Sequence, residues 1–422
     1  MPIALNEKQK EAVYSDKDKI LIIAPAGSGK TLTLVSAIKE YKRLNPDHHV
    51  VAITFTRKAA DDLALKLKGV SYVYPSTIHS WAYQELGNLA ERVYLEDPNR
   101  SFKIKLLQDD RVKEILGDLC KKRKYFYVKI DILYSYVMGN YNMDISDMLK
   151  SMFQAVHRDY IRFKEDNGLY DFTDLPTYLL DKLNDYEYDI EHIDALFVDE
   201  FQDVDDVQLE LFERVNAAKK FYIGDTQQAI YIFRGASEEV MKKLKGFYVY
   251  NLDVNYRSNQ EIIDFATTFQ KEAVFNPILF SAQLESFKSD IIAERGIGGE
   301  VYVLNRAGSA YKVNEYIKYK GVDIAKKFLD RNPMILCRTN KEVRQIKKFG
   351  LTDVQTIHQA KGLEYPNVIV TDFEIRGVED INLAYVAMTR AEDRLLATNY
   401  SAFVKILEKL KREKTLNTKS LF

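Results

Sequence analysis

The chain has 422 residues, enough for two or three domains, and its 46% hydrophobic and 29% charged residues are typical of a globular protein. A net charge of −1 argues mildly against a protein that holds nucleic acid by bulk charge alone, but not against one that holds a few nucleotides in a groove by stacking and local contacts. The absence of a long apolar run, of a secretion-type start and of metal-spaced cysteines (only Cys120 and Cys337) predicts a cytoplasmic protein without a membrane partner.

Short, apolar, β-branched runs alternate with helical patterns along most of the sequence, which is typical of parallel α/β sheets. The first set of expected buried strands comprises residues 19–24, 50–54, 195–198, 220–223 and 247–251. A second set comprises residues 301–304, 334–337, 354–357, 368–371 and 394–397. We therefore predict an α/β fold with two parallel-sheet cores in tandem, divided near residue 275.

One stretch interrupts this alternation and has a helical pattern, with apolar residues such as Ile115, Leu116 and Leu119 at near-helical spacing. It is interpreted as a helical insertion in the first core. The predicted domains are residues 1–87 with 167–275 for the first core, 88–166 for the insertion, 276–410 for the second core, and 411–422 for a polar, frayed tail.

The first expected strand leads into a glycine-rich loop that is followed by a helical pattern. Its residues are Ala24, Pro25, Ala26, Gly27, Ser28, Gly29, Lys30 and Thr31. Such a loop turns its N–H groups toward a phosphate chain, and the dipole of the following helix adds to the attraction. Lys30 would reach the outer phosphates and the Thr31 hydroxyl would ligate Mg²⁺. A plain glycine-rich turn is the alternative, but the strand before and the helix after favour the phosphate loop.

A phosphate loop also needs one carboxylate for the metal and another to activate water. The buried run at 195–198 ends in Asp199 and Glu200, which suit the metal shell and the general base, respectively. Acidic residues at a strand end are often only a solvated turn. Together with the glycine-rich loop, however, they predict a site for ATP and Mg²⁺.

Eight segments, in order, resemble the motifs of UvrD/Rep-type DNA helicases of superfamily 1. They are residues 5–13 (Q motif), 54–60 (Ia), 76–80 (Ib), 199–203 (II), 224–236 (III), 255–258 (IV), 356–366 (V) and 385–391 (VI). The resemblance covers roughly residues 5–400 and implies two tandem RecA-like P-loop NTPase domains. Residues 230–236 do not match the Pro-Pro-Val-like motif of the competing branch, so the resemblance also implies movement from 3′ to 5′.

The resemblance implies a role at the nucleotide for each matching position. These roles are adenine reading by Gln9, adenine stacking by Tyr256, ribose contact by Glu364, γ-phosphate contact by Gln228 and Arg257, and an arginine finger at Arg390. A guanidinium suits the last task because it is planar, always charged and forked. In isolation either arginine would be read as a surface cation. The γ-phosphate would draw the two cores together, and hydrolysis would release them.

Aromatic faces suit a track without sequence preference, because every base has a π-face. The resemblance implies base stacking by Phe55, Tyr231 and Phe233, and polar DNA contacts by Thr56, Thr77, His79, Arg234 and His358. The alternatives are core aromatics and structural histidines. A basic run at 121–129 with interleaved aromatics could touch DNA phosphates or a duplex junction, but a solvated helix end over core aromatics explains it equally well.

The expected function is an ATP-dependent 3′–5′ DNA helicase, a monomeric motor on single-stranded DNA and at single-strand/duplex junctions. Only residues 341–355 separate an Arg-Thr-Asn segment from motif V, so the large 2B subdomain of relatives is expected to be absent, as is an appended nuclease domain. Two alternatives stay open. One is a translocase that strips proteins from DNA but unwinds poorly, and the other is a nucleotide-gated DNA-binding adaptor serving replication, repair or defence proteins.

Overall fold

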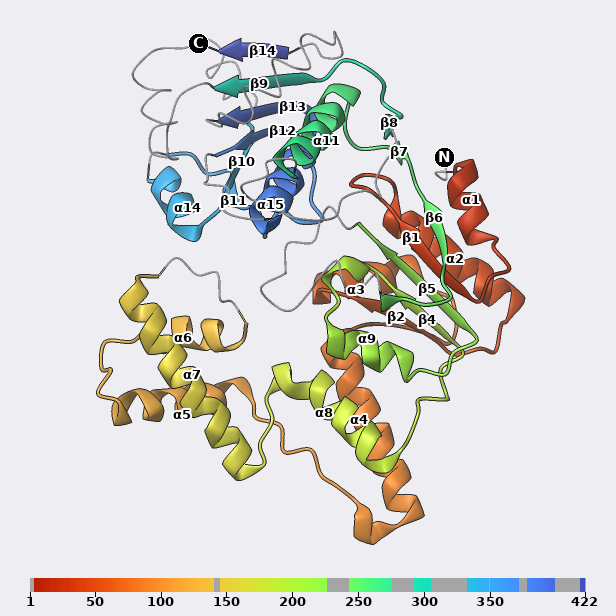
Figure 1. The fold of residues 1–422 in the computed structure, drawn as a ribbon, viewed down its shortest axis with the longest axis vertical. Coiled ribbons are helices and arrows are strands. Elements are labelled where there is room, and N and C mark those ends of the chain that lie inside the picture. Colours follow the sequence, from red (N-terminus) through yellow and green to blue (C-terminus); the bar gives the residue numbers. More distant parts are fainter. Residues whose placement is uncertain are drawn as a thin grey trace.

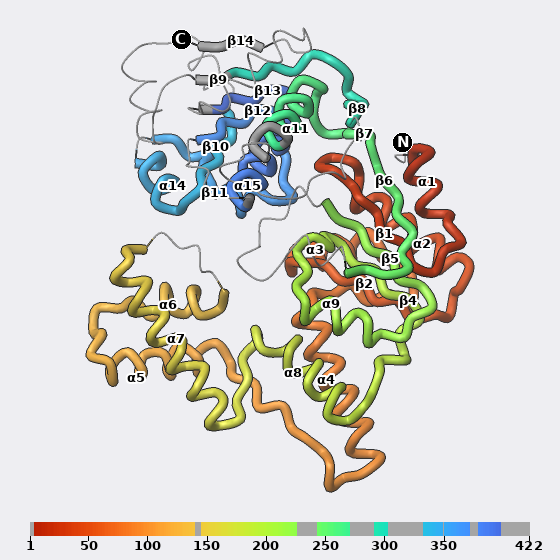
Figure 2. Tube along the Cα trace, viewed as in Figure 1, coloured from red at the N-terminus to blue at the C-terminus, as the bar shows by residue number. Residues whose placement is uncertain are grey.

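A computed structural model describes residues 4–139, 145–225, 243–274, 291–304, 332–348, 350–371, 378–398 and 418–421. These residues form two α/β cores and a separate helical lobe (Figure 1). Figure 2 follows the same path, from the first core through the lobe and back, and then into the second core. Within these ranges, no helix combines the length and apolarity that a bilayer crossing requires.

The first core is a six-stranded parallel sheet in the order β3-β2-β4-β5-β1-β6. Its strands are β1 (Lys19–Ile23), β2 (Val50–Thr54), β3 (Val73–Thr77), β4 (Ala195–Val198), β5 (Lys219–Gly224) and β6 (Tyr248–Asn251). Helices α1 (Glu7–Val13), α2 (Lys30–Leu44) and α3 (Arg57–Lys66) cover one face, and α4 (Ile78–Glu96), α8 (Leu175–Tyr186) and α9 (Asp206–Glu213) cover the other. Because both faces are covered, the central strands β2 and β4 are buried along their whole length.

The second core is also a six-stranded parallel sheet, in the order β11-β10-β12-β13-β9-β14. Its strands are β9 (Glu300–Leu304), β10 (Met334–Cys337), β11 (Val354–Thr356), β12 (Tyr365–Val370), β13 (Ala391–Thr398) and β14 (Thr418–Leu421). Helices α11 (Gln260–Val274) and α15 (Val378–Met388) pack on one face, and α14 (Asn340–Lys347) packs on the other. A short parallel pair, β7 (Val254–Asn255) with β8 (Ile292–Ala293), lies near the junction of the cores.

The predicted α/β fold with two parallel sheets is confirmed, and each predicted strand overlaps an observed one. The pattern missed β3, which contains Pro75 and polar residues. A proline is tolerated there because β3 is an edge strand. The predicted frayed tail is wrong for residues 418–421, which pair with β9 as β14. Backbone hydrogen bonds to a sheet edge form whatever the polarity of the side chains, so polarity alone did not reveal this strand.

The predicted division near residue 275 is also wrong. Residues 260–274 form α11, and its buried residues Ile262, Phe265 and Phe269 pack in the second core. The boundary therefore falls before α11. The helical period of this segment shows that one face is buried, but it does not show which of the two sheets buries it.

The helical lobe comprises α5 (Asp109–Lys122), α6 (Ile130–Val137) and α7 (Asp147–Asn167), which share a hydrophobic core of their own. Short 3-10 turns lie at η1 (Pro98–Arg100), η2 (Phe172–Asp174) and η3 (Phe201–Asp203).

The predicted insertion from residue 88 begins too early, because α4 continues unbroken to Glu96 and packs on the first sheet. Where the lobe rejoins the core, the buried Lys164 ammonium is paired with Asp171 and Asp174 at 2.7 and 2.6 Å.

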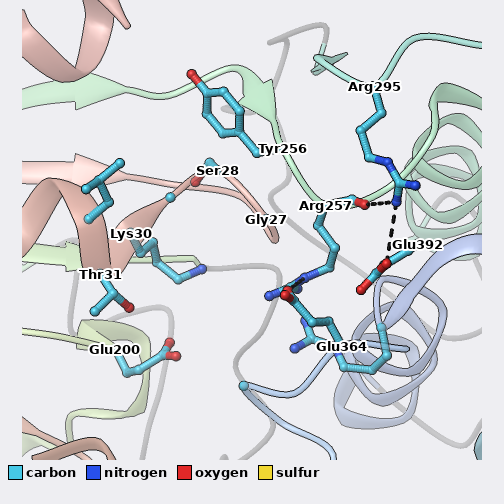
Figure 3. A pocket seen from close by; sticks show the side chains of 14 residues that line it. Gly27, Ser28, Lys30, Thr31, Glu200, Tyr256, Arg257, Arg295, Glu364 and Glu392 are labelled. Carbon is cyan, nitrogen blue, oxygen red and sulfur yellow. Dashed lines mark hydrogen bonds and ion pairs between the residues drawn. The ribbon is translucent and has the colours of Figure 1, made fainter. Parts of the chain in front are cut away.

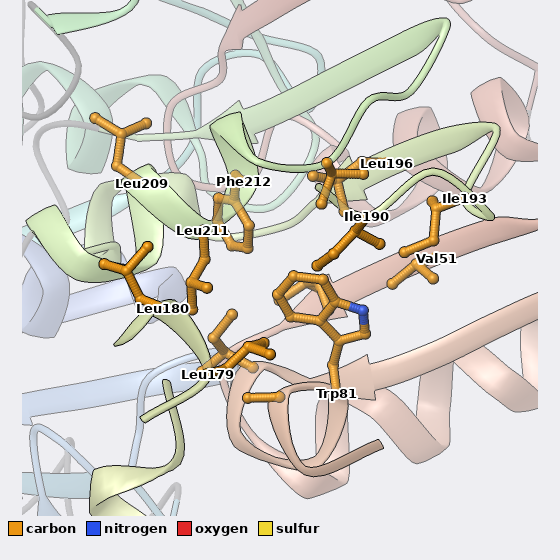
Figure 4. Packing of buried hydrophobic residues seen from close by; sticks show 14 of the residues in the cluster. Val51, Trp81, Leu179, Leu180, Ile190, Ile193, Leu196, Leu209, Leu211 and Phe212 are labelled. Atoms are coloured by element: carbon orange, nitrogen blue, oxygen red, sulfur yellow. The ribbon is translucent and has the colours of Figure 1, made fainter. Parts of the chain in front are cut away.

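Trp81 lies at the centre of the hydrophobic cluster between the first sheet and helices α4, α8 and α9 (Figure 4). Its side chain is 1% exposed, and its ring centroid is 6.1 Å from that of Phe212. Removing such a large buried side chain loses the free energy gained by burying it and leaves a cavity.

We expect Trp81→Ala to lower the free energy of unfolding of the first core by about 3–5 kcal/mol, measured by chemical denaturation. Tyr94→Ala is the matched control, because Tyr94 lies on the same helix but is 57% exposed. The control should change stability by less than about 0.5 kcal/mol. Equal, small effects of both substitutions would contradict the packing described.

Candidate functional site

The glycine-rich loop between β1 and α2 is shaped by two left-handed glycines, Gly27 with φ 71° and Gly29 with φ 80°. A Cβ on Gly27 would lie 2.8 Å from the Cβ of Arg257 and 2.8 Å from Asn255 Oδ1. A Cβ on Gly29 would lie 2.8 Å from Gln9 Nε2. Both positions therefore require glycine, for backbone conformation and for space.

The same loop presents polar groups at the N-terminus of α2. Among the described residues, no group hydrogen bonds to the buried Ser28 hydroxyl. Lys30 Nζ donates to the carbonyl of Ala24 at 3.2 Å, which holds the ammonium against the loop. Backbone N–H groups, the positive end of the helix dipole and the lysine together form a cradle for an anion.

Two adjacent carboxylates follow β4, which lies two strands from β1 in the sheet. Glu200 has φ 51°, a left-handed conformation that costs a non-glycine residue about 1–3 kcal/mol and is common at functional sites. Burial, followed by the charge of Glu200, raises the pKa of Asp199 to about 7. Burial also opposes ionisation of Glu200, but Lys361 and Lys30 outweigh it and lower the pKa of Glu200 to about 2. Glu200 is therefore ionised at neutral pH.

Gln202 connects Glu200 to the end of β5. Its Nε2 donates to Glu200, and its Oε1 accepts the N–H of Asp225 at 2.7 Å. The Gln202 side chain is buried and lies against Gly224, where a Cβ would come within 2.6 Å of Oε1. This bridge fixes the carboxylate of Glu200 and links it to the chain that enters residues 226–242, which lie outside the described ranges.

A pocket of about 500 Å³ lies between this loop and the second core, a volume suited to a small-molecule ligand. The first core and the strand leading out of it contribute Gly27, Ser28, Gly29, Lys30, Thr31, Leu32, Glu200, Tyr256 and Arg257, and the part of the chain after α11 contributes Arg295, Gly362, Glu364, Arg390 and Glu392. In Figure 3, Lys30 and Glu200 lie on one side of this space, and Arg257 and Glu364 lie on the other.

Two guanidinium groups meet at the pocket. Arg257 Nε donates to Glu364 Oε2 at 2.9 Å. Arg390 is 1% exposed, and its Nε and Nη1 donate to the carbonyls of Val386 and Leu363 at 2.9 and 3.2 Å. Burial, followed by the charge of Arg257, lowers the pKa of Arg390 to about 9. Two cations held this close in a partly desolvated pocket favour the binding of a polyanion.

The two cores are in direct contact around the pocket. Lys361 of the second core forms an ion pair with the buried Asp203 of the first. Ser258 Oγ donates to the carbonyl of Ala391 at 2.6 Å. Ala26 of the glycine-rich loop packs in the hydrophobic cluster of the second core. A ligand in the pocket would therefore touch both cores at once.

Matches to two protein-family models agree with the order of the sequence motifs. Residues 5–248 match the UvrD/REP helicase N-terminal domain, and residues 352–398 match the UvrD-like helicase C-terminal domain. The chain belongs to the UvrD/Rep helicase family.

Several proteins to which this chain is similar are named helicases. It is 25% identical to a probable DNA helicase II homolog of Mycoplasma capricolum, with 99% of this chain and 59% of the relative aligned. It is 27% identical to a probable DNA helicase of Mycoplasma pneumoniae, over 96% of this chain and 87% of the relative. It is 26% identical to the ATP-dependent DNA helicase Rep of Buchnera aphidicola, over 82% and 56%. The chain thus spans less than two thirds of the first and third relatives.

The structure brings most of the predicted nucleotide residues to one pocket: Gly27, Ser28, Gly29, Lys30, Thr31, Glu200, Tyr256, Arg257, Glu364 and Arg390. Ala24 and Ala26 are buried at the base of the loop. Gln9 is buried as well; it accepts the Asn6 N–H at 2.9 Å and donates to the Ser28 carbonyl at 3.0 Å. Gln9 therefore supports the loop, and adenine reading by Gln9 stays a prediction.

Arg295 and Asn255 are among the residues at the site that were not assigned a role from the sequence. Arg295 lines the pocket, donates to the Arg257 carbonyl at 2.8 Å and pairs with Glu392 (Figure 3). It follows β8, outside every motif, so no sequence signal marked it. Asn255 opens motif IV, and its side chain accepts from Arg257 N–H at 2.8 Å and donates to the Ala26 carbonyl at 2.7 Å. Its place in the motif was a signal that could have found it.

The predicted DNA residues are spread over both cores. Phe55, Thr56 and Thr77 lie at the carboxyl ends of β2 and β3, where Thr56 and Thr77 cap helices α3 and α4 through their hydroxyls. The His79 ring stacks on Phe172 at 5.0 Å. DNA contact by these residues and by His358, which follows β11 in the second core, stays a prediction. Gln228, Tyr231, Phe233 and Arg234 lie outside the described residues.

Proposed function

We propose that this protein is a motor that hydrolyses ATP and moves from 3′ to 5′ along single-stranded DNA, separating the duplex ahead of it. The observation that carries the proposal is the pocket at the seam of the two cores, which is lined by Lys30 and Glu200 from one core and by Arg390 from the other. The relatives of this chain are named DNA helicases, which supports DNA as the track.

The donor set of the pocket fits MgATP. In our proposal, the loop N–H groups and Lys30 bind the phosphates, while Thr31 and Asp199 offer the hard oxygen ligands that Mg²⁺ prefers. The metal would neutralise phosphate charge there. Glu200 accepts a proton from the attacking water, and Arg257 and Arg390 stabilise charge that develops on the γ-phosphate.

The coupling of hydrolysis to movement would run through the contacts across the seam. Arg257 is paired with Glu364 in the structure, so a γ-phosphate would compete for the same guanidinium. Binding and loss of that phosphate would shift the balance between closed and open arrangements of the cores. Since predicted DNA residues lie on both cores, with His358 on the second, alternating closure would move one DNA contact relative to the other.

Two alternative functions each differ from the proposed motor in one activity, either strand separation or ATP hydrolysis. A translocase that displaces proteins would share the whole site but unwind weakly, and the short connection between β10 and β11, where the described chain holds only α14, is compatible with that. A nucleotide-gated adaptor would need no water-activating base. The strained, ionised Glu200 argues against it.

The deciding experiment measures ATP hydrolysis and strand separation on partial duplexes with a 3′ or a 5′ single-stranded tail. We expect hydrolysis to rise with single-stranded DNA and unwinding to require a 3′ tail. Lys30→Ala should abolish both activities, while Lys39→Ala, an exposed lysine on the same helix α2, should retain them. Preference for a 5′ tail would reject the polarity, and hydrolysis indifferent to DNA would reject the motor.

A further inference from the structure

The basic run between α5 and α6 had two open readings, and the exposure of its aromatics separates them. Phe126 and Tyr127 are 76% and 62% exposed, whereas Tyr125 and Val128 pack against the core of the lobe. The run is therefore not simply a helix end over core aromatics. Two adjacent aromatic side chains thus present their surfaces to solvent, where a partner could contact them.

The charged residues next to these aromatics in the sequence all have the same sign. Every charged residue from 121 to 129 is basic, and Lys121, Lys122 and Lys124 are exposed. Lys121 is paired with the exposed Asp118, and such a solvent-exposed pair is weak and leaves the ammonium available to a polyanion. Arg123 is held by Asp159 through two hydrogen bonds, at 2.5 and 2.8 Å, so its guanidinium is already occupied. Lysines beside exposed aromatic rings match the chemistry of unpaired nucleotides, whose phosphates and bases they can bind together.

The backbone holds this turn in one conformation. Tyr125 N–H donates to the Cys120 carbonyl at 2.9 Å and Lys124 N–H donates to the Lys121 carbonyl at 3.0 Å, the two bonds of a Schellman ending of α5. Lys124 takes the left-handed position, with φ 60°. At the end of α7 this position is filled by Gly168, and a side chain there costs about 1 kcal/mol relative to glycine. Glycine would therefore be more stable than Lys124 at this position.

Tyr127 is also tied to the neighbouring helix. Its hydroxyl donates to Met152 Sδ at 3.5 Å, and Met148, one turn earlier on α7, is 63% exposed. Figure 1 shows that the turn between α5 and α6 lies on the outer side of the lobe, away from both sheets. A strand bound here would therefore not be the strand in the seam between the cores.

We propose that the turn at residues 121–127 is a second nucleic-acid site, which binds unpaired nucleotides of the other arm of a DNA fork while the cores hold the tracked strand. Phe126 and Tyr127 stack on bases, and Lys122 and Lys124 bind phosphates. This site deepens the proposed function and rests on it, because only a protein that engages one arm of a fork brings the second arm close.

The test compares the affinity, by fluorescence anisotropy without nucleotide, for a 3′-tailed duplex and for the same duplex with an added single-stranded 5′ arm. We expect the parent protein to bind the fork about tenfold more tightly, the effect of roughly one stacked base. Phe126→Ala with Tyr127→Ala should bind the two DNAs equally. Lys124→Gly should reduce the advantage severalfold and lower the salt dependence of fork binding, without lowering the melting temperature.

Glu187→Gly is the matched control, because Glu187 takes the same left-handed position at the end of α8, with φ 57°. It should leave the fork advantage unchanged. A parent protein that binds both DNAs equally, or a Phe126/Tyr127 double variant that keeps the advantage, would overturn the second site. Hydrolysis stimulated by a short single strand is measured in parallel and should persist in every variant. Its absence in the parent would reject the motor instead, so the two proposals fail separately.

Discussion

Replacing Glu200 by glutamine should reduce ATP turnover on single-stranded DNA by about 10²–10⁴-fold, the usual contribution of a positioned general base. The substitution keeps the size of the side chain and its contact with Gln202, but it removes the proton acceptor. ATP binding should persist, since Lys30 and the glycine-rich loop are unchanged. Steady-state hydrolysis and the affinity for a fluorescent ATP analogue measure the two effects.

The control for this result is Glu210→Gln, an exposed glutamate on α9 of the same core. It should hydrolyse ATP at the parental rate. If Glu200→Gln matched the parent as well, Glu200 would not be the base. If it lost nucleotide binding together with hydrolysis, its role would be structural.

Arg390→Lys should lower kcat by about 10³–10⁵-fold, the range associated with an arginine finger. A lysine keeps one charge but cannot fork onto two phosphate oxygens. Arg390 lines the pocket, and the carbonyls of Val386 and Leu363 hold its guanidinium in place. Single-turnover hydrolysis separates this loss from any change in ATP affinity.

Arg394→Lys is the matched control, because Arg394 lies on β13 of the same core and pairs with Glu300 outside the pocket. It should change kcat little. A parental kcat in Arg390→Lys would show that the guanidinium does not act on the γ-phosphate. A melting temperature lowered only in Arg390→Lys would instead point to a role in packing.

Most strands of the sheets could be predicted because each of them carries its own signal. Runs such as Val50–Thr54 and Met334–Cys337 are apolar on both faces, and that pattern depends only on neighbours in sequence. Edge strand β3 has no such signal, because an edge needs no apolar run. The packing of α11 on the second core was missed for a related reason, since the pattern of an amphipathic helix does not specify which sheet it covers.

The sequence by itself determined the chemistry of this protein: the glycines that the loop geometry requires, the lysine at the start of α2, the carboxylates after β4, and the order of motifs that marks the UvrD/Rep family. These signals are local, because each residue type is set by the backbone or the ligand beside it. Only the tertiary structure decided which residues share the pocket, placed Arg295 among them, and left Phe126 and Tyr127 in solvent. Exposure and contact between distant segments depend on how the cores and the lobe pack, and no short stretch of sequence encodes that packing.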